Sequence, residues 1–259
     1  SDFKNTIIST DDISFFAPNL KNKKQKIIVN GYVSGTLNDL FTKDIKLRTD
    51  GSDISGSLRV SGLPNADNML IDFSTTGSTI QFNDVATWAP TINNFSNGLK
   101  QGLKTVRFKG SFKGFTNDFA VKGDIITNDG ALHTDLKMKL GINKNIYDAA
   151  IITTDLHLGK LLGIADLGKI NFDGTLTGQG FDVNTTKMQF NGNLNSTFYH
   201  NYNYRNIKIK GALNGTLLNA HLDANDPNLE GVLDAVIDLK AKKQSYITNG
   251  YLTKANFQP

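Results

Sequence analysis

One short motif recurs along the chain and constrains its fold more than any other feature: apolar, any residue, Gly, any residue, apolar, any residue, Gly. Successive residues of a β-strand face opposite sides of a sheet, so this alternation predicts strands whose glycines share a face with the apolar residues. The copies recur at irregular intervals, which excludes a solenoid of fixed repeat length. The four full copies are Val29–Gly35, Phe108–Gly114, Phe172–Gly178 and Ile209–Gly215.

The same alternation extends over most of the chain. Leu229–Lys240, for example, places apolar residues on one face and mostly acidic or basic ones on the other. Composition agrees, because Asp, Asn and Gly favour turns over helices, and the 259 residues include 24 glycines and a single glutamate. Further strands are predicted at Asp44–Thr49, Ile54–Val60, Met69–Phe73, Phe119–Ile126, Leu132–Leu140, Tyr147–Asp155, Thr186–Leu194 and Asn206–Leu217.

Helical signals are short and few. Asp12–Phe16 follows capping residues and precedes a proline, the interval 84–104 holds two interrupted helical turns, and His157–Leu161 is short and apolar. None is long enough to form a second layer over a sheet of about a dozen strands. The sequence therefore predicts an all-β protein. Its long, antiparallel-rich sheet must cover its apolar face with itself, as a sandwich, a barrel or a rolled trough.

Residues that usually carry catalysis or metal binding form no recognisable site. The chain has no cysteine, and its four histidines lack the spacing of metal ligands. It has neither a Gly-x-Ser-x-Gly nucleophile motif nor a Walker loop, and its aspartate pairs fit caps and turns. Basic and aromatic residues are not interleaved as in a single-strand nucleic-acid groove. We therefore expect no enzyme activity, no metal, no cofactor and no nucleic-acid partner.

The recurrent glycines leave two hypotheses open. Inward faces of ordinary sandwiches are filled by bulky side chains, whereas here glycine recurs among them. The glycines either ease the twist of a long sheet and mark bulges, or they leave room for a non-protein molecule against the apolar face. The pattern alone does not favour one of these.

Several segments, taken in order, resemble a known family. Asp12–Leu20 followed by Val29–Leu40 resembles the Bacteroidota branch of the TamB proteins, and so do Ser61–Pro64 and Phe108–Phe119. Leu156–Gly163 is similar to a recurrent segment of the wider AsmA-like superfamily. Each segment is a degenerate β pattern, and the resemblance depends on their order along the chain.

The resemblance implies a long sheet rolled into an open, taco-like trough with an apolar interior. It also implies a single elongated region over residues 1–259, with a helical insert at about 84–104. TamB-like proteins cross the periplasm, are anchored in the inner membrane by an N-terminal helix, and meet an outer-membrane barrel of the TamA/BamA type. The chain is then expected to be an internal fragment, with the anchor and the barrel-binding region outside it. The implied localisation is the periplasm.

The function implied is passive phospholipid transport between the two membranes, in support of outer-membrane protein assembly. Acyl chains would move along the apolar face while headgroups project from the open side. The alternative hypothesis is a β-sandwich adhesin or carbohydrate-binding module, with Tyr199, His200, Tyr202 and Tyr204 as its aromatic cluster. The candidate groove residues are Val29, Val33, Leu58, Phe112, Leu136, Met138, Leu176, Phe190, Leu213 and Leu233.

Overall fold

The strands form one long antiparallel sheet. A computed structural model describes residues 1–14, 21–63, 65, 68–88, 97–141, 144–162, 165–180, 184–238 and 246–256. Its 17-stranded sheet is open and does not close into a barrel, and its helices are few and short. The predicted all-β class with an open, antiparallel sheet is therefore confirmed. Among the residues described, none of the helices has both the length and the apolar content needed to span a bilayer.

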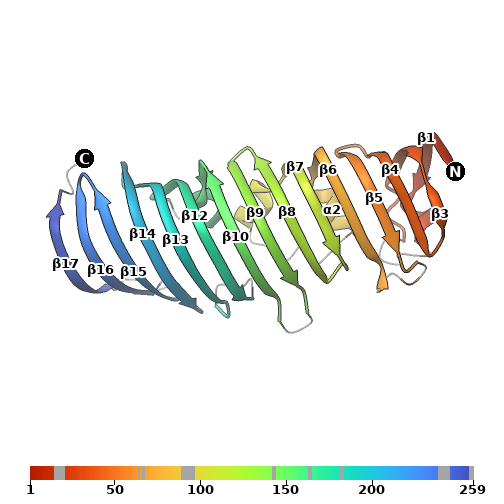
Figure 1. The fold of residues 1–259 in the computed structure, drawn as a ribbon. Helices are drawn as coiled ribbons and strands as arrows, with labels where there is room; N and C mark the ends of the chain where they lie inside the picture. Colours follow the sequence, from red (N-terminus) through yellow and green to blue (C-terminus); the bar gives the residue numbers. More distant parts are fainter. Residues whose placement is uncertain are drawn as a thin grey trace. The chain divides into compact units, whose positions relative to one another are not determined.

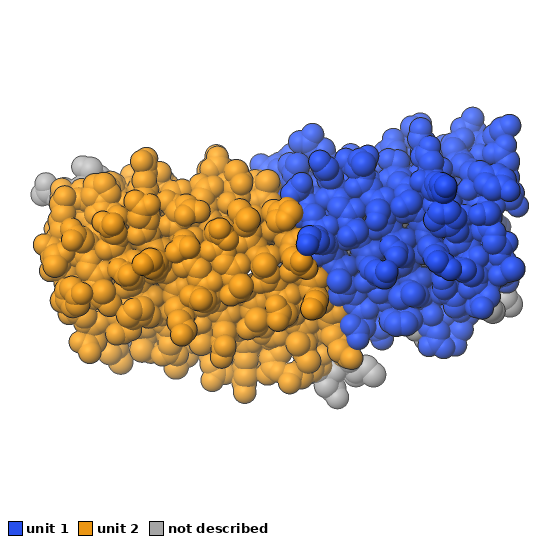
Figure 2. All heavy atoms as spheres, viewed as in Figure 1, with its two compact units in different colours: residues 1–128 blue, residues 129–259 orange. Residues whose placement is uncertain are grey.

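The chain divides into two compact units, residues 1–128 and 129–259, which Figure 2 colours separately. The elements of unit 1 are β1 (Asp2–Ser9), α1 (Thr10–Ile13), β2 (Lys26–Tyr32), β3 (Ser34–Thr36), β4 (Asp39–Arg48), β5 (Asp53–Ser61), β6 (Leu70–Gln81), α2 (Phe82–Trp88), α3 (Asn97–Gly102), β7 (Thr105–Gly114) and β8 (Asp118–Thr127). The elements of unit 2 are β9 (Gly130–Lys139), β10 (Ile146–Thr154), β11 (Leu156–His157), α4 (Leu158–Leu162), β12 (Leu167–Gln179), β13 (Lys187–Tyr199), β14 (Tyr202–Asn214), β15 (Leu217–Asp226), β16 (Leu229–Asp238) and β17 (Tyr246–Ala255).

In both units, strands that follow one another in sequence pair antiparallel, as the colours of Figure 1 show. In unit 1, β4 to β8 form a meander, and β2 lies between β1 and β4. In unit 2, β9, β10 and β12 to β17 form a second meander, with the two-residue β11 paired to β12. Most strands need only a short connection to their neighbour, which suits the many turn residues of the sequence; the connection from β6 to β7 is longer and contains α2 and α3.

The buried cluster of unit 1 lies where its first strands meet. Ile27, Val29 and Ile45 form its centre, and they come from β2 and β4. The N-terminal segment covers this centre, because β1 and α1 supply apolar side chains that pack against it. Helix α1 is fixed there by a capping box in which Ser9 and Asp12 bond each other's backbone N–H groups. The side chains packed around the centre are Phe3, Ile8, Ile13, Val33, Leu47 and Leu58.

Strand boundaries differ from the predictions where a turn or a bulge interrupts the alternation. The single strand predicted for Asn206–Leu217 is wrong, because it spans the end of β14, a turn at Gly215 and the first residue of β15. Gly215 has a φ of +59° and therefore belongs to the turn, not to the strand motif that it completes in sequence. Strand β1 was not predicted at all, and the 17 strands exceed the number expected.

The structure has short helices at the three predicted places, with bounds that differ by one or more residues. Helix α1 lies at the predicted Asp12–Phe16 site, although Phe15 and Phe16 are outside the described residues. Helix α2 begins two residues before the predicted interval 84–104 and α3 lies inside it, and 89–96 are outside the described residues. Helix α4 lies at the predicted His157–Leu161 site.

Gly110 shows why the recurrent motif requires glycine in unit 1. It lies opposite Gly123 in the pairing of β7 with β8, and its φ is +152°. A Cβ atom at Gly110 would collide with the carbonyl oxygen of Lys122 and would lie 2.8 Å from the Cα of Gly123. The two strands therefore approach each other in a way that only glycine allows.

Candidate functional site: an apolar face across the sheet

Nine of the ten candidate groove residues lie in strands, on the apolar face of their own unit, and Val33 lies between β2 and β3. We define this face by residues that are direct cross-strand partners, because such partners point to the same side. Val29 is 6% exposed, and the other nine are half-buried. Residues next to them in sequence point the other way, and among these neighbours Tyr32 is 65% exposed.

In unit 2, six of the candidates fall in three adjacent rows that run across the strands. Each row crosses seven strands, β9, β10 and β12 to β16, so at a strand spacing of about 4.8 Å it is about 29 Å long. We call these the three apolar rows. They are Thr134–Ile151–Gly174–Gly192–Ile209–Leu222–Leu233, Leu136–Ala149–Leu176–Phe190–Gly211–Ala220–Ala235, and Met138–Tyr147–Gly178–Met188–Leu213–Leu218–Ile237.

None of the residues in the three apolar rows carries a charge. The opposite face of the same strands, which we call the wet face, carries charges throughout. Lys137 is the direct partner of Asp148, and Lys210 is the direct partner of His221. Because a charge in an apolar environment is costly, this separation keeps one face of the sheet suited to contact with hydrocarbon.

In unit 2, the hydroxyl groups of Thr134 and Thr153 on the apolar face are bonded to the backbone. Thr134 is 2% exposed, and its hydroxyl donates to the carbonyl of Ala150 at 3.2 Å. Thr153 is 5% exposed, donates to the carbonyl of Ile170 at 3.3 Å and accepts from the N–H of Phe172 at 2.8 Å. These threonines therefore offer no free hydroxyl to a polar ligand.

Aromatic rings of the chain occupy the space beside the glycines of unit 2. A Cβ atom at Gly192 would lie 2.7 Å from Cζ of Phe172, and the same ring crowds Gly174. The ring of Phe190 crowds Gly211 in the same way, and that of Tyr147 crowds Gly178. The hypothesis that these glycines leave room for a non-protein molecule is therefore wrong at these positions. The rings fill the gaps and make the apolar face continuous.

Unit 1 has a comparable row that includes two candidates. Leu58, Phe73, Phe112 and Val121 are successive partners across β5 to β8. Phe112 also stacks on Phe119, with ring centroids 5.0 Å apart. The candidates Val29 and Val33 belong to the buried cluster under β1 and α1, and Leu58 also packs against it. At this end of unit 1, protein side chains already cover the apolar face.

The aromatic cluster of the alternative hypothesis lies at the hairpin between β13 and β14. Tyr199 meets His200 edge to face, with ring planes at 74°, and Tyr202 meets Tyr204 at 73°. Burial and a 3.0 Å hydrogen bond from its hydroxyl to Asp226 raise the pKa of Tyr202. Rings at these angles do not form the flat platform on which a sugar ring stacks.

Within the described residues, no group of three or more His, Cys, Asp or Glu side chains is placed to hold a metal ion. Comparison with protein-family models, with curated proteins and with solved structures finds no match for this chain. Sequence alternation identified the apolar face, but it did not identify the rows. The rows depend on strand register, which turn lengths and the packing of whole strands determine together.

Proposed function

We propose that the apolar face carries the acyl chains of phospholipids. In this proposal the chain is a TamB-like section of a periplasmic bridge that supports passive lipid transport between the inner and outer membranes. Its partners are then phospholipids and, through regions outside this chain, an outer-membrane barrel of the TamA/BamA type. The observation that carries the proposal is the set of three apolar rows, which cross seven strands of an open sheet without a charge.

The dimensions of the rows fit a hydrocarbon chain. One leaflet of a bilayer has a hydrocarbon depth of about 15 Å, half of the roughly 30 Å core. Three rows at two-residue spacing cover about 14 Å along the strands, and each extends about 29 Å across them. A complete acyl chain therefore fits along the rows, and each CH₂ group removed from water contributes about 0.8 kcal/mol.

The chemistry of the rows favours movement over tight, specific binding. Small-molecule sites combine an apolar pocket with a few polar groups that fix the ligand's orientation. Apart from the hydroxyl of Tyr147, the rows lack such groups, because Thr134 already bonds the backbone and the glycine gaps are filled by rings such as Phe172. A surface of this kind holds hydrocarbon without selecting one position, as a sliding path requires.

The matched pair Leu213→Asp and Asn214→Asp tests the proposal. Leu213 belongs to the apolar rows, whereas the neighbouring Asn214 is exposed on the wet face. The purified chain is mixed with a fluorescent phospholipid, and bound lipid is measured by fluorescence titration. Leu213→Asp should weaken binding at least about tenfold, because a carboxylate beside the acyl chain loses its hydration. Asn214→Asp should bind as the unchanged chain does.

Circular dichroism of both variants separates lost binding from lost folding. Leu213 is half-buried, so we expect Leu213→Asp to fold, and in the full-length protein to block lipid passage. If it does not fold, Leu213→Ser replaces it, because Ser introduces polarity without charge. Failure of the unchanged chain to bind phospholipid, or equal loss in both aspartate variants, contradicts the proposal.

A further inference from the structure

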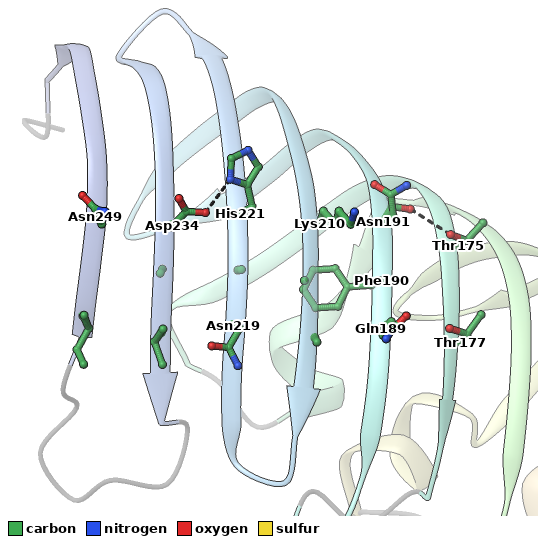
Figure 3. Close-up of a pocket in the computed structure, with 16 residues that line it drawn as sticks. Thr175, Thr177, Gln189, Phe190, Asn191, Lys210, Asn219, His221, Asp234 and Asn249 are labelled. Carbon is green, nitrogen blue, oxygen red and sulfur yellow. Dashed lines mark hydrogen bonds and ion pairs between the residues drawn. The ribbon is translucent and has the colours of Figure 1, made fainter.

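The wet face of unit 2 contains a hollow with a volume of about 720 Å³ (Figure 3). One side is a row of polar side chains that are direct partners across β13 to β17. That row contains Asn191, Lys210, His221, Asp234 and Asn249. Small residues also line the hollow: Ala212 on the wet face, and Gly211, Ala220 and Ala235 of the second apolar row.

Lys210 is a cation that lines this hollow and has no ion-pair partner among the described residues. It makes no hydrogen bond or ion pair with any residue that the structure describes, whereas Lys208, two residues earlier, lies 3.7 Å from Asp223. The carboxylate of Asp234 is occupied by His221, whose Nδ1 lies 2.7 Å from Asp234 Oδ1 (Figure 3). This contact orients the imidazole and leaves Nε2 available to a ligand. Lys210 is therefore the cation of the hollow that has no ion-pair partner among the described residues, and the carboxylate of Asp234 is held by His221.

The remaining polar groups are mainly amides. Gln189, Asn191, Asn219 and Asn249 line the hollow, and each amide presents both a donor and an acceptor. Sugar hydroxyls are also donors and acceptors, so the two kinds of group are complementary. A polyanion such as nucleic acid would need several cations, and the hollow provides one.

We propose that this hollow binds a sugar unit that carries one negative charge, with Lys210 at the anionic group and the amides at the hydroxyls. The charge comes from a carboxylate, as in a uronic acid, or from a phosphate ester. Lys210 and the amides belong to the face opposite the three apolar rows, although Phe190, Gly211, Ala220 and Ala235 of the second row also line the hollow. The proposed sugar contacts therefore use none of the apolar side chains of the proposed lipid path. The site gives the wet face a ligand of its own.

The test uses methyl glucuronide, glucose 6-phosphate and neutral methyl glucoside as probes. Binding is followed by NMR chemical-shift changes of backbone amides in the purified chain. We expect at least one anionic probe to bind and to shift the amides of Asn191, Lys210 and His221. If only one anionic probe binds, its charged group, carboxylate or phosphate, is the one that the hollow recognises. If both bind, the hollow accepts either anionic group on a sugar. Lys210→Gln should weaken binding about tenfold.

The matched control is Lys208→Gln, which removes the same charge from the same face of β14 outside the hollow. This variant should leave the affinity within about twofold, because Lys208 is exposed outside the hollow and solvent and salt screen its charge from a ligand there. Three results overturn the proposal. These are no binding of either anionic probe, equal binding of the neutral glucoside, and equal loss of affinity in the Lys208 and Lys210 variants.

Discussion

Two Thr→Val substitutions should change stability in opposite directions, although the chemical change is identical. Thr153 and Thr42 are both on the apolar face and only 5% and 3% exposed. The hydroxyl of Thr153 bridges Ile170 and Phe172 at the point where the pairing of β10 with β12 ends. The hydroxyl of Thr42 is buried without a hydrogen-bond partner among the described residues. Valine has nearly the shape of threonine, so packing is nearly unchanged in both variants.

The expected magnitudes follow from those contacts. Thr153→Val leaves the buried N–H of Phe172 without its acceptor, and an unsatisfied buried polar group costs about 1–3 kcal/mol. Thr42→Val removes a hydroxyl that is desolvated without compensation, and we expect a gain of about 1 kcal/mol. Thr153→Ser is the control, because it keeps the hydroxyl and loses one methyl group, worth about 0.8 kcal/mol.

Urea denaturation followed by circular dichroism measures both effects as shifts of the midpoint. At a slope of about 2 kcal/mol per M, a loss of 2 kcal/mol lowers the midpoint by about 1 M. Thr153→Val should therefore have the lowest midpoint, and Thr42→Val should lie above the unchanged chain. Shifts of the same sign in both valine variants, or a Thr153→Ser midpoint as low as that of Thr153→Val, would refute the reasoning.

Two further predictions concern other contacts. Gly192→Ala should lower the free energy of unfolding by about 1–3 kcal/mol, because its Cβ meets Phe172, whereas Gly77→Ala, with open space around its Cβ, should be near neutral in the same urea assay. The hydrogen bonds of Arg59 hold the pKa of Asp39 below its ordinary value. The stability from this pair is therefore present above the ordinary Asp pKa and is lost as pH falls through the lower folded value. NMR titration should show the Asp39 pKa rising in Arg59→Gln; an unchanged pKa contradicts this assignment.

Alternation predicts strands well only where no bulge interrupts it. In β1, the pairing with β2 shifts between Phe3 and Thr6, and Asn5 has a φ of +48°. Phe3 and Ile8 therefore both pack against the buried cluster although one number is odd and the other even. A strict two-residue period cannot detect such a strand.

The polar hollow was missed for a different reason. Lys210, His221 and Asp234 each look like ordinary exposed residues in their own strands. They become one site only because two consecutive strand pairings align them across the sheet. Register depends on turn lengths and on the packing of whole strands, so local composition carried no signal for this site.

Photo-crosslinking tests the proposed lipid path most directly. A photoreactive amino acid is placed in turn at Leu176, Phe190 and Leu213 in the apolar rows, and at the wet-face neighbours Thr175 and Asn214. The chain is irradiated in the presence of phospholipid, and lipid adducts are measured by mass spectrometry. Our account predicts adducts at the three apolar positions and none at the two wet-face positions. Equal labelling of both faces, or no labelling at Leu176, Phe190 and Leu213, would contradict it.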